Sequence, residues 1–290
     1  MKLGLLGSFC IFFQIANTAD AQTPKAPHEI VSQAPASAWR LVNNDDVLKI
    51  QLPTGPVYIE LNPILAPNHV ANIKLLAREQ FYDGLSMYRF VEGFVAQGGD
   101  ASNSKVTKHA KKQLSAELIL NSKKPFLSVT ALNMVDGYAQ RTGFFSGFAV
   151  AQNLQATQTW QTHCTGAFAM AREDALNSGG TEFYITLSAQ RYLDKNTTVF
   201  GQVLSGMEHV QKLDRSPTHG QVFNHIESVR VLSDIASKDK QRFKVFNTSH
   251  DDFKTLIEAR KNRPEAWFVA KPNYLDVCAI KVPVSTFTVD

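Results

Sequence analysis

The segment Tyr88–Asp100, YRFVEGFVAQGGD, brings an arginine, a glutamine and several aromatic residues together within thirteen positions. Apolar and polar residues alternate as in a strand, an arginine stands between two aromatic residues, and a Gly-Gly pair bends the chain. The segment has no obvious nucleophile, metal ligand or phosphate-binding loop. Nucleophilic, metal-assisted and phosphate-binding chemistry are therefore not indicated by this segment.

Two other chemistries are disfavoured elsewhere in the chain. His163 adjoins Cys164, but neighbours on an extended chain point to opposite faces, so the two would make a poor nucleophile–base pair. The eight histidines form neither an HExxH motif nor part of a paired CxxC framework. We expect no metal site and no cofactor.

The composition is that of an ordinary soluble globular protein. The 290 residues are 44% hydrophobic and 19% charged, enough for one good core or two small ones. The formal net charge of +4 is too weak to predict nucleic-acid binding, which requires basic residues clustered on one face. The basic run KVTKHAKK lacks interleaved aromatic residues, which favours a solvated loop over a contact with an anionic surface.

Residues 1–21 have the pattern of a cleaved secretory signal. Met1-Lys2 precedes the apolar run LGLLGSFCIFFQIA, which is too short to span a membrane, and small residues follow at Ala19-Asp20-Ala21. A lipoprotein anchor would need small residues just before Cys10, where Phe9 stands instead. We expect a periplasmic protein without a stable membrane anchor.

Cleavage after Ala21 would leave two cysteines, Cys164 and Cys278, in an exported protein. This context favours a disulfide between them, which would close a loop of roughly a hundred residues. Two buried free thiols are the alternative, because a sequence does not report the distance between two side chains.

Short strands predominate along the chain. Residues 22–43 are rich in Ala, Pro and Ser and predict a flexible tether. VLKIQL and VYIEL alternate apolar and polar residues around Pro53-Thr54-Gly55-Pro56, which predicts a hairpin. A helix follows, opened by Pro67 and carrying an apolar stripe at Val70, Ile73, Leu76 and Ala77. Together with FAMA, EFYITL, TVFGQVL and IESVRVL, the pattern indicates a closed antiparallel barrel with caps.

Three motifs in order resemble the cyclophilin-type peptidyl-prolyl isomerases. RFVEGFVAQGGD resembles that family's active-site strand pair, GAFAMAREDALNSGGTEFYITL its second signature, and YLDKNTTVFGQVLSGMEHVQKL its closing strand and second helix. The resemblance covers residues 46–232. It implies a mostly β fold, a closed eight-stranded antiparallel barrel capped by two helices, with the site on its outer face.

The resemblance also divides the chain. We expect a cyclophilin-like domain at 44–232, interrupted by an insertion at about 101–165, and a helix-plus-strand extension at 233–290 packed on the barrel. The aromatic stretch 143–147 of the insertion lies either near the pocket or in a packed loop, and we favour the loop. In the extension, Ser249 and Asp252 resemble a capping box ahead of an apolar helical stripe at Phe253, Leu256 and Ile257.

The resemblance assigns roles residue by residue. The family's catalytic arginine falls on Arg89, its pocket phenylalanine on Phe94 and its substrate-binding glutamine on Gln97. The start of the backbone-binding strand falls on Met170 and Ala171, and a pocket leucine on Leu193. On this assignment Phe94, Met170, Tyr184 and Leu193 would hold the prolyl ring. The implied reaction, rotation of an X–Pro bond, meets a barrier of about 20 kcal/mol from amide resonance and moves no proton or electron. It needs only a prolyl pocket and a donor beside the twisted amide.

Five positions depart from the family pattern: Val95, Tyr184, Tyr192, Thr197 and Glu182. The first four are mostly conservative or vary among bacterial members. Glu182 replaces a glutamine, and an ionised carboxylate only accepts hydrogen bonds. Near Arg89 it could hold the guanidinium or draw it from the substrate. A solvated strand carboxylate is the alternative.

Two functions remain open. The first is a monomeric, exported prolyl isomerase acting on proline-containing peptides or unfolded exported proteins. The second is a weak or inactive cyclophilin-like module that binds peptides or acts as a chaperone, because Glu182 has silenced catalysis. A tight Arg89–Glu182 pair across the groove supports the second function, and an open arginine supports the first.

Overall fold

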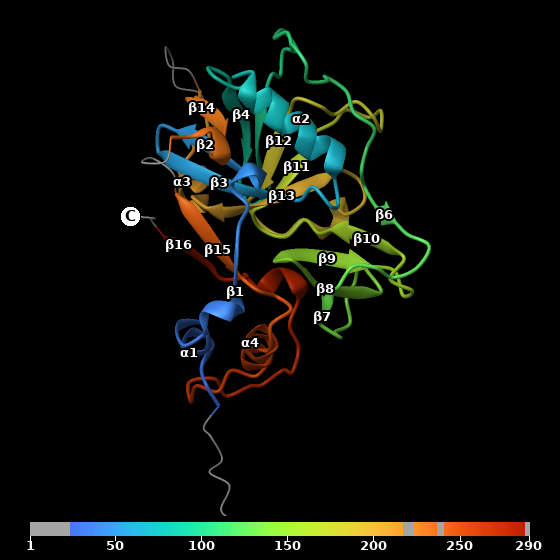
Figure 1. The fold of residues 1–290 in the computed structure, drawn as a ribbon, viewed down its shortest axis with the longest axis vertical. Coiled ribbons are helices and arrows are strands. Elements are labelled where there is room, and N and C mark those ends of the chain that lie inside the picture. The colour runs from blue at the N-terminus through green and yellow to red at the C-terminus, as the bar shows by residue number, and fades with distance from the viewer. Residues whose placement is uncertain (1–23, 217–222, 237–240, 288–290) are drawn as a thin grey trace, which may run out of the picture.

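The computed structural model describes residues 24–216, 223–236 and 241–287 (Figure 1). The predicted signal segment, residues 1–21, lies outside these residues. The helices are α1 (Pro27–Ser32), α2 (Pro67–Arg78), α3 (Met207–Gln211) and α4 (Asp251–Lys261), with 3₁₀ turns at Ala36–Ala38, Asn44–Asp46, Arg191–Leu193, Leu232–Asp234 and Val277–Ala279. Within the described part of the chain, no helix combines the length and apolarity needed to cross a membrane.

One antiparallel sheet of eight strands contains the three motifs. Its order is β14-β2-β3-β13-β11-β12-β5-β4. In chain order the strands are β2 (Val47–Leu52), β3 (Gly55–Leu61), β4 (Ser86–Val91), β5 (Val95–Gly99), β11 (Ala167–Met170), β12 (Phe183–Thr186), β13 (Val199–Ser205) and β14 (Ser228–Val231). The predicted hairpin around residues 53–56 is confirmed, because β2 and β3 pair up to Leu52 and Gly55.

The two edge strands of this sheet, β14 and β4, form no ladder with each other among the described residues. The start of β4 meets loop backbone instead: Ser86 forms an isolated bridge with His225, and the Met87 amide donates to the Asn224 carbonyl at 2.8 Å. The prediction of a closed barrel is therefore wrong, and the sheet is curled but open at this seam. At this end of β4, the backbone hydrogen-bonding groups of the strand edge are therefore paired with loop residues rather than with another strand.

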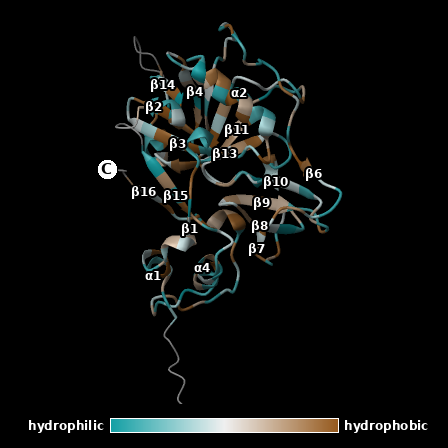
Figure 2. Cartoon of the chain, viewed as in Figure 1, coloured by the Kyte–Doolittle hydropathy of each residue, from teal (hydrophilic) through white to brown (hydrophobic). Residues whose placement is uncertain are grey.

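The inner face of the curled sheet encloses the main core. Alternate strand residues point inward and pack with the apolar stripe predicted for α2, which is confirmed as buried at Val70, Ile73, Leu76 and Ala77. Val210 adds the apolar side of α3 to the same core. Figure 2 shows brown and teal segments alternating around α2, as expected for a helix with one buried face.

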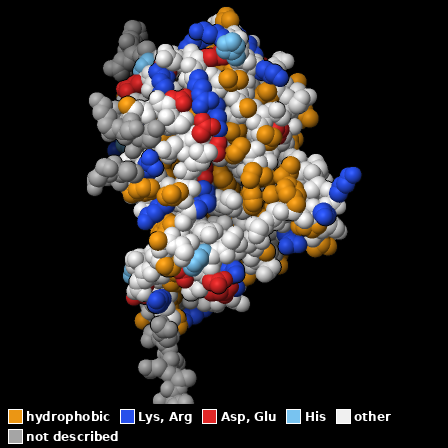
Figure 3. All heavy atoms as spheres, in the orientation of Figure 1, with side chains coloured by type: hydrophobic (Ala, Val, Ile, Leu, Met, Phe, Trp, Pro, Cys, Tyr) orange, Lys and Arg blue, Asp and Glu red, His pale blue; other side chains and the backbone are white. Residues whose placement is uncertain are grey.

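The insertion forms a second antiparallel sheet, in the order β6-β10-β9-β8-β7. Its strands are β6 (Leu120–Asn121), β7 (Thr130–Ala131), β8 (Arg141–Phe145), β9 (Phe148–Gln152) and β10 (Gln158–Gln161). The aromatic stretch 143–147 is the end of β8 and its turn rather than a loop. Its Phe144 packs edge-on against Phe253 of α4, with ring centroids 5.2 Å apart. Figure 3 shows further hydrophobic side chains gathered on the surface near β10.

Residues 24–43 carry regular structure, so the predicted flexible tether is wrong over this stretch. After α1, strand β1 (Trp39–Leu41) pairs with β15 (Arg242–Phe246), which also pairs with β16 (Val284–Phe287). Ile30 and Ala38 are buried in one cluster with α4, beside which α1 lies in Figure 1. Few side chains are buried in this segment. Its apolar residues therefore do not recur at the spacing of a helix or strand, which is the signal that sequence-based prediction uses.

The C-terminal extension contributes β15, α4 and β16. The predicted apolar stripe of α4 is confirmed as buried. Its predicted capping box is wrong: the N-cap is His250, whose Nδ1 accepts from the Asp252 amide at 3.2 Å. The extension also reaches the large sheet, because Phe243 and Val245 of β15 share a cluster with Leu204 of β13.

Cys164 and Cys278 form a disulfide, as predicted, with their Cα atoms 4.8 Å apart across 114 positions of sequence. Cys164 lies just before β11, and Cys278 lies in the 3₁₀ turn that precedes β16. The bond therefore joins the extension to the loop that leads into a strand of the large sheet.

We expect the double variant Cys164→Ser/Cys278→Ser to lose about 2–5 kcal/mol of unfolding free energy, because its unfolded chain regains the entropy of a long open loop. Equilibrium urea unfolding measures the loss, and wild type kept in reductant should match the variant. An unfolding midpoint equal to that of the oxidised wild type would contradict this expectation.

Candidate active site

One row of residues crosses four strands on the outer face of the large sheet. Arg89 of β4 is opposite Gln97 of β5, Gln97 is opposite Tyr184 of β12, and Tyr184 is opposite Ala169 of β11. Residues directly opposed on antiparallel strands project from the same face. Strand pairing alone therefore brings the predicted arginine, glutamine and pocket aromatic together.

An apolar cluster lies on this face beside the row. Its buried members are Val95, Ala167, Ala169, Tyr184 and Val199, and Phe94, Ala171 and Leu193 are partly buried against them. Phe94 comes from the turn between β4 and β5, and exposed Tyr192 stacks against it with ring centroids 6.5 Å apart. The Arg89 Cζ atom lies 5.6 Å from the centroid of the Phe94 ring. The cluster thus forms an apolar patch with a guanidinium at its edge.

Gln97 holds the Arg89 guanidinium through its carbonyl. Arg89 Nη1 donates to Gln97 Oε1 at 3.1 Å, and the Gln97 amide nitrogen donates in the other direction, to the Tyr88 hydroxyl and to Glu182 Oε2, the latter at 3.2 Å. Since a guanidinium carries five N–H donors, Arg89 keeps several for a bound peptide. Its side chain is exposed at this point.

Glu182 pairs with Tyr88. Its Oε2 accepts a hydrogen bond from the Tyr88 hydroxyl, and no ion pair between Glu182 and Arg89 exists in the described chain. Gly99 helps to direct the carboxylate, because a Cβ there, at a φ of +127°, would lie 2.8 Å from the Thr181 carbonyl. Because Gly99 has no side chain, residues 181–182 can lie close to the backbone of β5 at this position.

The Tyr88 phenol remains protonated beside this carboxylate. Burial, followed by the hydrogen bond and negative charge of Glu182, raises the pKa of Tyr88 well above its ordinary value. The phenol therefore keeps donating to Glu182, and the Gln97 amide keeps its orientation.

A buried histidine lies behind the pocket aromatic. His163 Nε2 is 3.0 Å from both the Tyr184 hydroxyl and Thr197 Oγ1, and its Nδ1 is 3.0 Å from Asp194 Oδ1. Tyr184 and Thr197 also share a short hydrogen bond. The two departures from the family pattern at Tyr184 and Thr197 are thus parts of one polar network.

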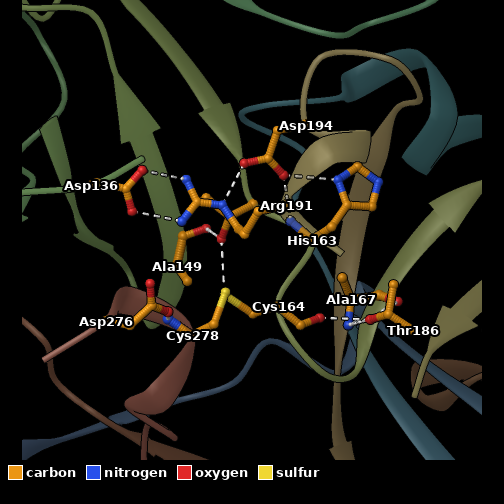
Figure 4. Close-up of a disulfide and its surroundings, with 11 residues drawn as sticks. Asp136, Ala149, His163, Cys164, Ala167, Thr186, Arg191, Asp194, Asp276 and Cys278 are labelled. Atoms are coloured by element: carbon orange, nitrogen blue, oxygen red, sulfur yellow. Dashed lines mark hydrogen bonds and ion pairs between the residues drawn. A yellow bond between two sulfur atoms is a disulfide. The ribbon is translucent and has the colours of Figure 1, made fainter. Parts of the chain in front are cut away.

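This network continues into a buried ion cluster (Figure 4). Arg191 Nε donates to Asp194 at 2.6 Å, and the two terminal nitrogens of Arg191 donate to Asp136 at 2.9 and 3.1 Å. The three side chains are at most 5% exposed. Because Asp136 belongs to the insertion, this contact ties the insertion to the turn that carries Tyr192 and Leu193.

Met170 is the predicted site residue that the fold places elsewhere. Its side chain packs in the inner core with Phe168 and Phe183, whereas Ala169 and Ala171 belong to the outer cluster. Alternate residues of a strand point to opposite faces, so the assignment of Met170 to the prolyl pocket is wrong. Its amide donates to the Thr198 carbonyl at 2.9 Å.

Three contributors were missed by sequence reasoning: Tyr88, His163 and Asp194. Tyr88 offered a signal, because it adjoins Arg89 inside the first motif. His163 lies ahead of the second motif and was considered only beside Cys164 or as a metal ligand. No spacing rule joins positions 163 and 194. Among the described residues, no group of three or more His, Cys, Asp or Glu could hold a metal ion.

Residues 47–233 match the family described as Cyclophilin type peptidyl-prolyl cis-trans isomerase/CLD, and the chain belongs to that family. The predicted enzyme class, a peptidyl-prolyl cis-trans isomerase, is thereby confirmed.

Relatives carry similar descriptions. A probable peptidyl-prolyl cis-trans isomerase of Brucella suis is 31% identical over 172 residues, 59% of this chain and 72% of that protein. Peptidyl-prolyl cis-trans isomerase B of Bacillus subtilis is 28% identical over 166 residues, 57% and 88% of the two chains. The crystal structure of the cyclophilin AquaCyp293 from Hirschia baltica has a TM-score of 0.71 and 28% identity, covering 87% of this chain and 94% of that one. This last likeness extends beyond residues 47–233.

Burial raises the pKa of Tyr184, which predicts a loss of stability at alkaline pH. Phenols of the unfolded chain ionise near pH 10, whereas the buried phenol stays neutral. The buried phenol of Tyr184 therefore makes its full contribution to the free energy of unfolding below about pH 10. Above that pH the contribution falls by up to about 1.4 kcal/mol per pH unit. We expect Tyr184→Phe to show a shallower decline of unfolding free energy above that pH, measured by urea unfolding.

Tyr192→Phe is the matched control, because Tyr192 is 57% exposed as a residue. We expect it to retain the slope of wild type. The account of the Tyr184 network would be contradicted by a Tyr184→Phe slope as steep as that of wild type.

Proposed function

We propose that the chain catalyses rotation of X–Pro bonds with Arg89 as its catalytic residue and the outer apolar cluster as its prolyl pocket. The observation that carries this proposal is the position of the Arg89 guanidinium. It is exposed at the edge of the pocket, 5.6 Å from the centre of the Phe94 ring, and its hydrogen bond goes to Gln97 rather than to a carboxylate.

The chemistry follows from amide resonance. As the X–Pro bond twists, its nitrogen loses conjugation and gains a lone pair that can accept a hydrogen bond. A guanidinium already in place beside that nitrogen stabilises the twisted amide more than the planar one. Phe94, Tyr184 and Leu193 would hold the prolyl ring, with Val95 at the base of the pocket and Ala171 along the strand that receives the peptide backbone.

Gln97 would position Arg89 for a bound peptide. Its Oε1 accepts from Arg89, which limits the motion of the guanidinium before a peptide binds. Glu182 supports this arrangement, because it and Tyr88 occupy the Gln97 amide nitrogen and leave the carbonyl turned toward Arg89. On this proposal the replacement of glutamine by Glu182 is compatible with catalysis.

We also propose that the substrates are exported proteins with accessible X–Pro bonds, and that the chain acts on them as a periplasmic monomer. The signal-like pattern of residues 1–21 supports export. The Cys164–Cys278 disulfide supports it independently, because disulfides persist mainly in oxidising compartments.

A peptide-binding module without catalysis is the second candidate. The same apolar cluster favours peptide binding whether or not the bond rotates. This candidate requires Glu182 to withdraw Arg89 from the groove, and Glu182 has Tyr88 as its partner.

A protease-coupled isomerisation assay on the chain from Gln22 tests the proposal. We expect an active wild type, a fall in kcat/KM of about 10²–10³ for Arg89→Ala because a preorganised donor is lost, and a change within about threefold for Glu182→Gln, which conserves shape. Peptide affinity of Arg89→Ala, measured separately, should change less than its turnover.

A silent wild type together with an active Glu182→Gln variant would favour the binding module. Full activity of Arg89→Ala would contradict the assignment of Arg89.

A further inference from the structure

A basic cleft lies at the end of the molecule formed by α1, α4 and the segment that leads into β16. Its volume is about 610 Å³, and its lining, as far as the described residues go, includes Arg260, Arg263, Lys281 and His28 and no acidic residue. The remaining walls are largely apolar and include Val31, Leu204, Val282 and Val284. Cations set into apolar walls fit an anion that is attached to an apolar body.

Arg260 is the cation in this cleft whose hydrogen-bonding groups are not all satisfied. Its Nε is buried without a hydrogen-bond partner, and within the described residues its guanidinium forms no ion pair. Burial, and then the positive charge of Arg263, lowers the pKa of Arg260. The neighbouring carboxylates are already engaged, since Glu258 pairs with Lys261 at 3.1 Å and Glu265 pairs with Arg263. An external anion in the cleft would compensate the charge of the Arg260 guanidinium.

An exposed apolar loop adjoins the basic cleft. We define the aromatic loop as residues 263–274, which Asn262 closes through hydrogen bonds of 3.0 Å to Asn273. Arg263 belongs to both features, because it lines the cleft and its Cζ lies 4.7 Å from the centroid of the Phe268 ring. At the tip, Trp267 is 83% exposed and Val269 is 98% exposed. Such exposed apolar side chains mark a surface that meets another apolar phase.

We propose that the basic cleft and the aromatic loop together dock the protein on a lipid bilayer that contains anionic phospholipids. A lipid phosphate would bind Arg260 and Lys281 in the cleft, and the apolar walls would cover the glycerol and upper acyl groups. Trp267 and Val269 would enter the interfacial region, where tryptophan is favoured. Lys271, on the same loop, would extend its ammonium toward the headgroups.

A bilayer fits this surface better than an acidic peptide does. An acidic peptide would satisfy the guanidinium of Arg260 but would leave the solvent-exposed tip at Trp267 and Val269 without an apolar partner. A bilayer supplies both the anion and the apolar layer at one surface. In Figure 1 the aromatic loop and α4 lie at the bottom, while β4 and β12, which carry the candidate active site, lie near the top. Docking would therefore leave the prolyl pocket open.

The test uses the chain from Gln22, which contains every described residue, after circular dichroism shows that it melts as the full chain does. Without residues 1–21, their apolar run cannot contribute to lipid binding. Vesicles of phosphatidylcholine alone are compared with an equal mixture of phosphatidylcholine and phosphatidylglycerol, by co-sedimentation and by tryptophan emission. We expect binding only to the mixture, with a blue shift of the emission that Trp267→Phe abolishes.

Charge variants test the cleft. Arg260→Gln/Lys281→Gln should weaken binding to the mixture about 30-fold, since each basic residue near an anionic surface adds about fivefold. Lys123→Gln/Lys124→Gln, with the same loss of charge in the insertion, is the matched control and should change binding far less. Phe126, 58% exposed in the insertion, provides a matched control for the aromatic change as Phe126→Ala. Isomerase turnover in solution should be the same in all four variants and in wild type.

Three results would overturn the proposal. Equal binding to neutral and anionic vesicles would remove the role of the cleft, and equal weakening by the two double variants would reduce it to net charge. Binding of inorganic phosphate or of an acidic peptide that depends on Arg260, without binding to vesicles, would assign the cleft to a soluble anion or a protein partner instead.

Discussion

The pairing of β4, β5, β12 and β11 is the constraint on which the candidate active site depends. This pairing sets Arg89, Gln97, Tyr184 and Ala169 in one row on the outer face. The register of the pairing is fixed by residues on the inner face of the sheet. The inward neighbours, such as Ala96 and Phe183, are fully buried in the main core. A slip of one residue would move this core into solvent, so burial on the inner face fixes the positions of the outer residues.

Polar contacts then determine how the side chains of the outer row are oriented. The Gln97 amide lies between a cation and a carboxylate, so its two ends are occupied by Arg89 and by Glu182 with Tyr88. A second polar network, from Tyr184 through His163 to Asp194, supports the pocket from behind. Arg191 extends this network to Asp136 of the insertion, and the disulfide joins the same region to the C-terminal extension. The insertion and the C-terminal extension are thus both joined to elements that lie behind the pocket.

Residues with local patterns could be predicted from sequence, and residues joined only in space could not. The β2–β3 hairpin and the α2 and α4 stripes follow from alternation and helical period. The positions of Arg89, Phe94 and Gln97 follow from the resemblance to the family's motifs. Strand alternation, applied to FAMA, would also have placed Met170 in the core. The partner of Glu182 could not be predicted from the sequence. The choice between Arg89 and Tyr88 depends on the bulge in β4 and on the close approach of residues 181–182 to Gly99. The short N-terminal elements were missed because Ile30 and Ala38 are buried by α4, some two hundred residues away in sequence.

In the proposed function, Arg89 is free of Glu182 and catalyses rotation of a bound X–Pro amide. The most direct measurement is exchange NMR on a labelled proline-containing peptide in the presence of a small amount of protein, because it observes cis and trans peptide without a coupling protease. Uncatalysed exchange takes tens of seconds or longer. We expect exchange cross-peaks at sub-second mixing times with wild type, and their loss with Arg89→Ala while peptide shifts still report binding. Peptide shifts that saturate with wild type without any exchange cross-peak would contradict it and make the fold a binding module.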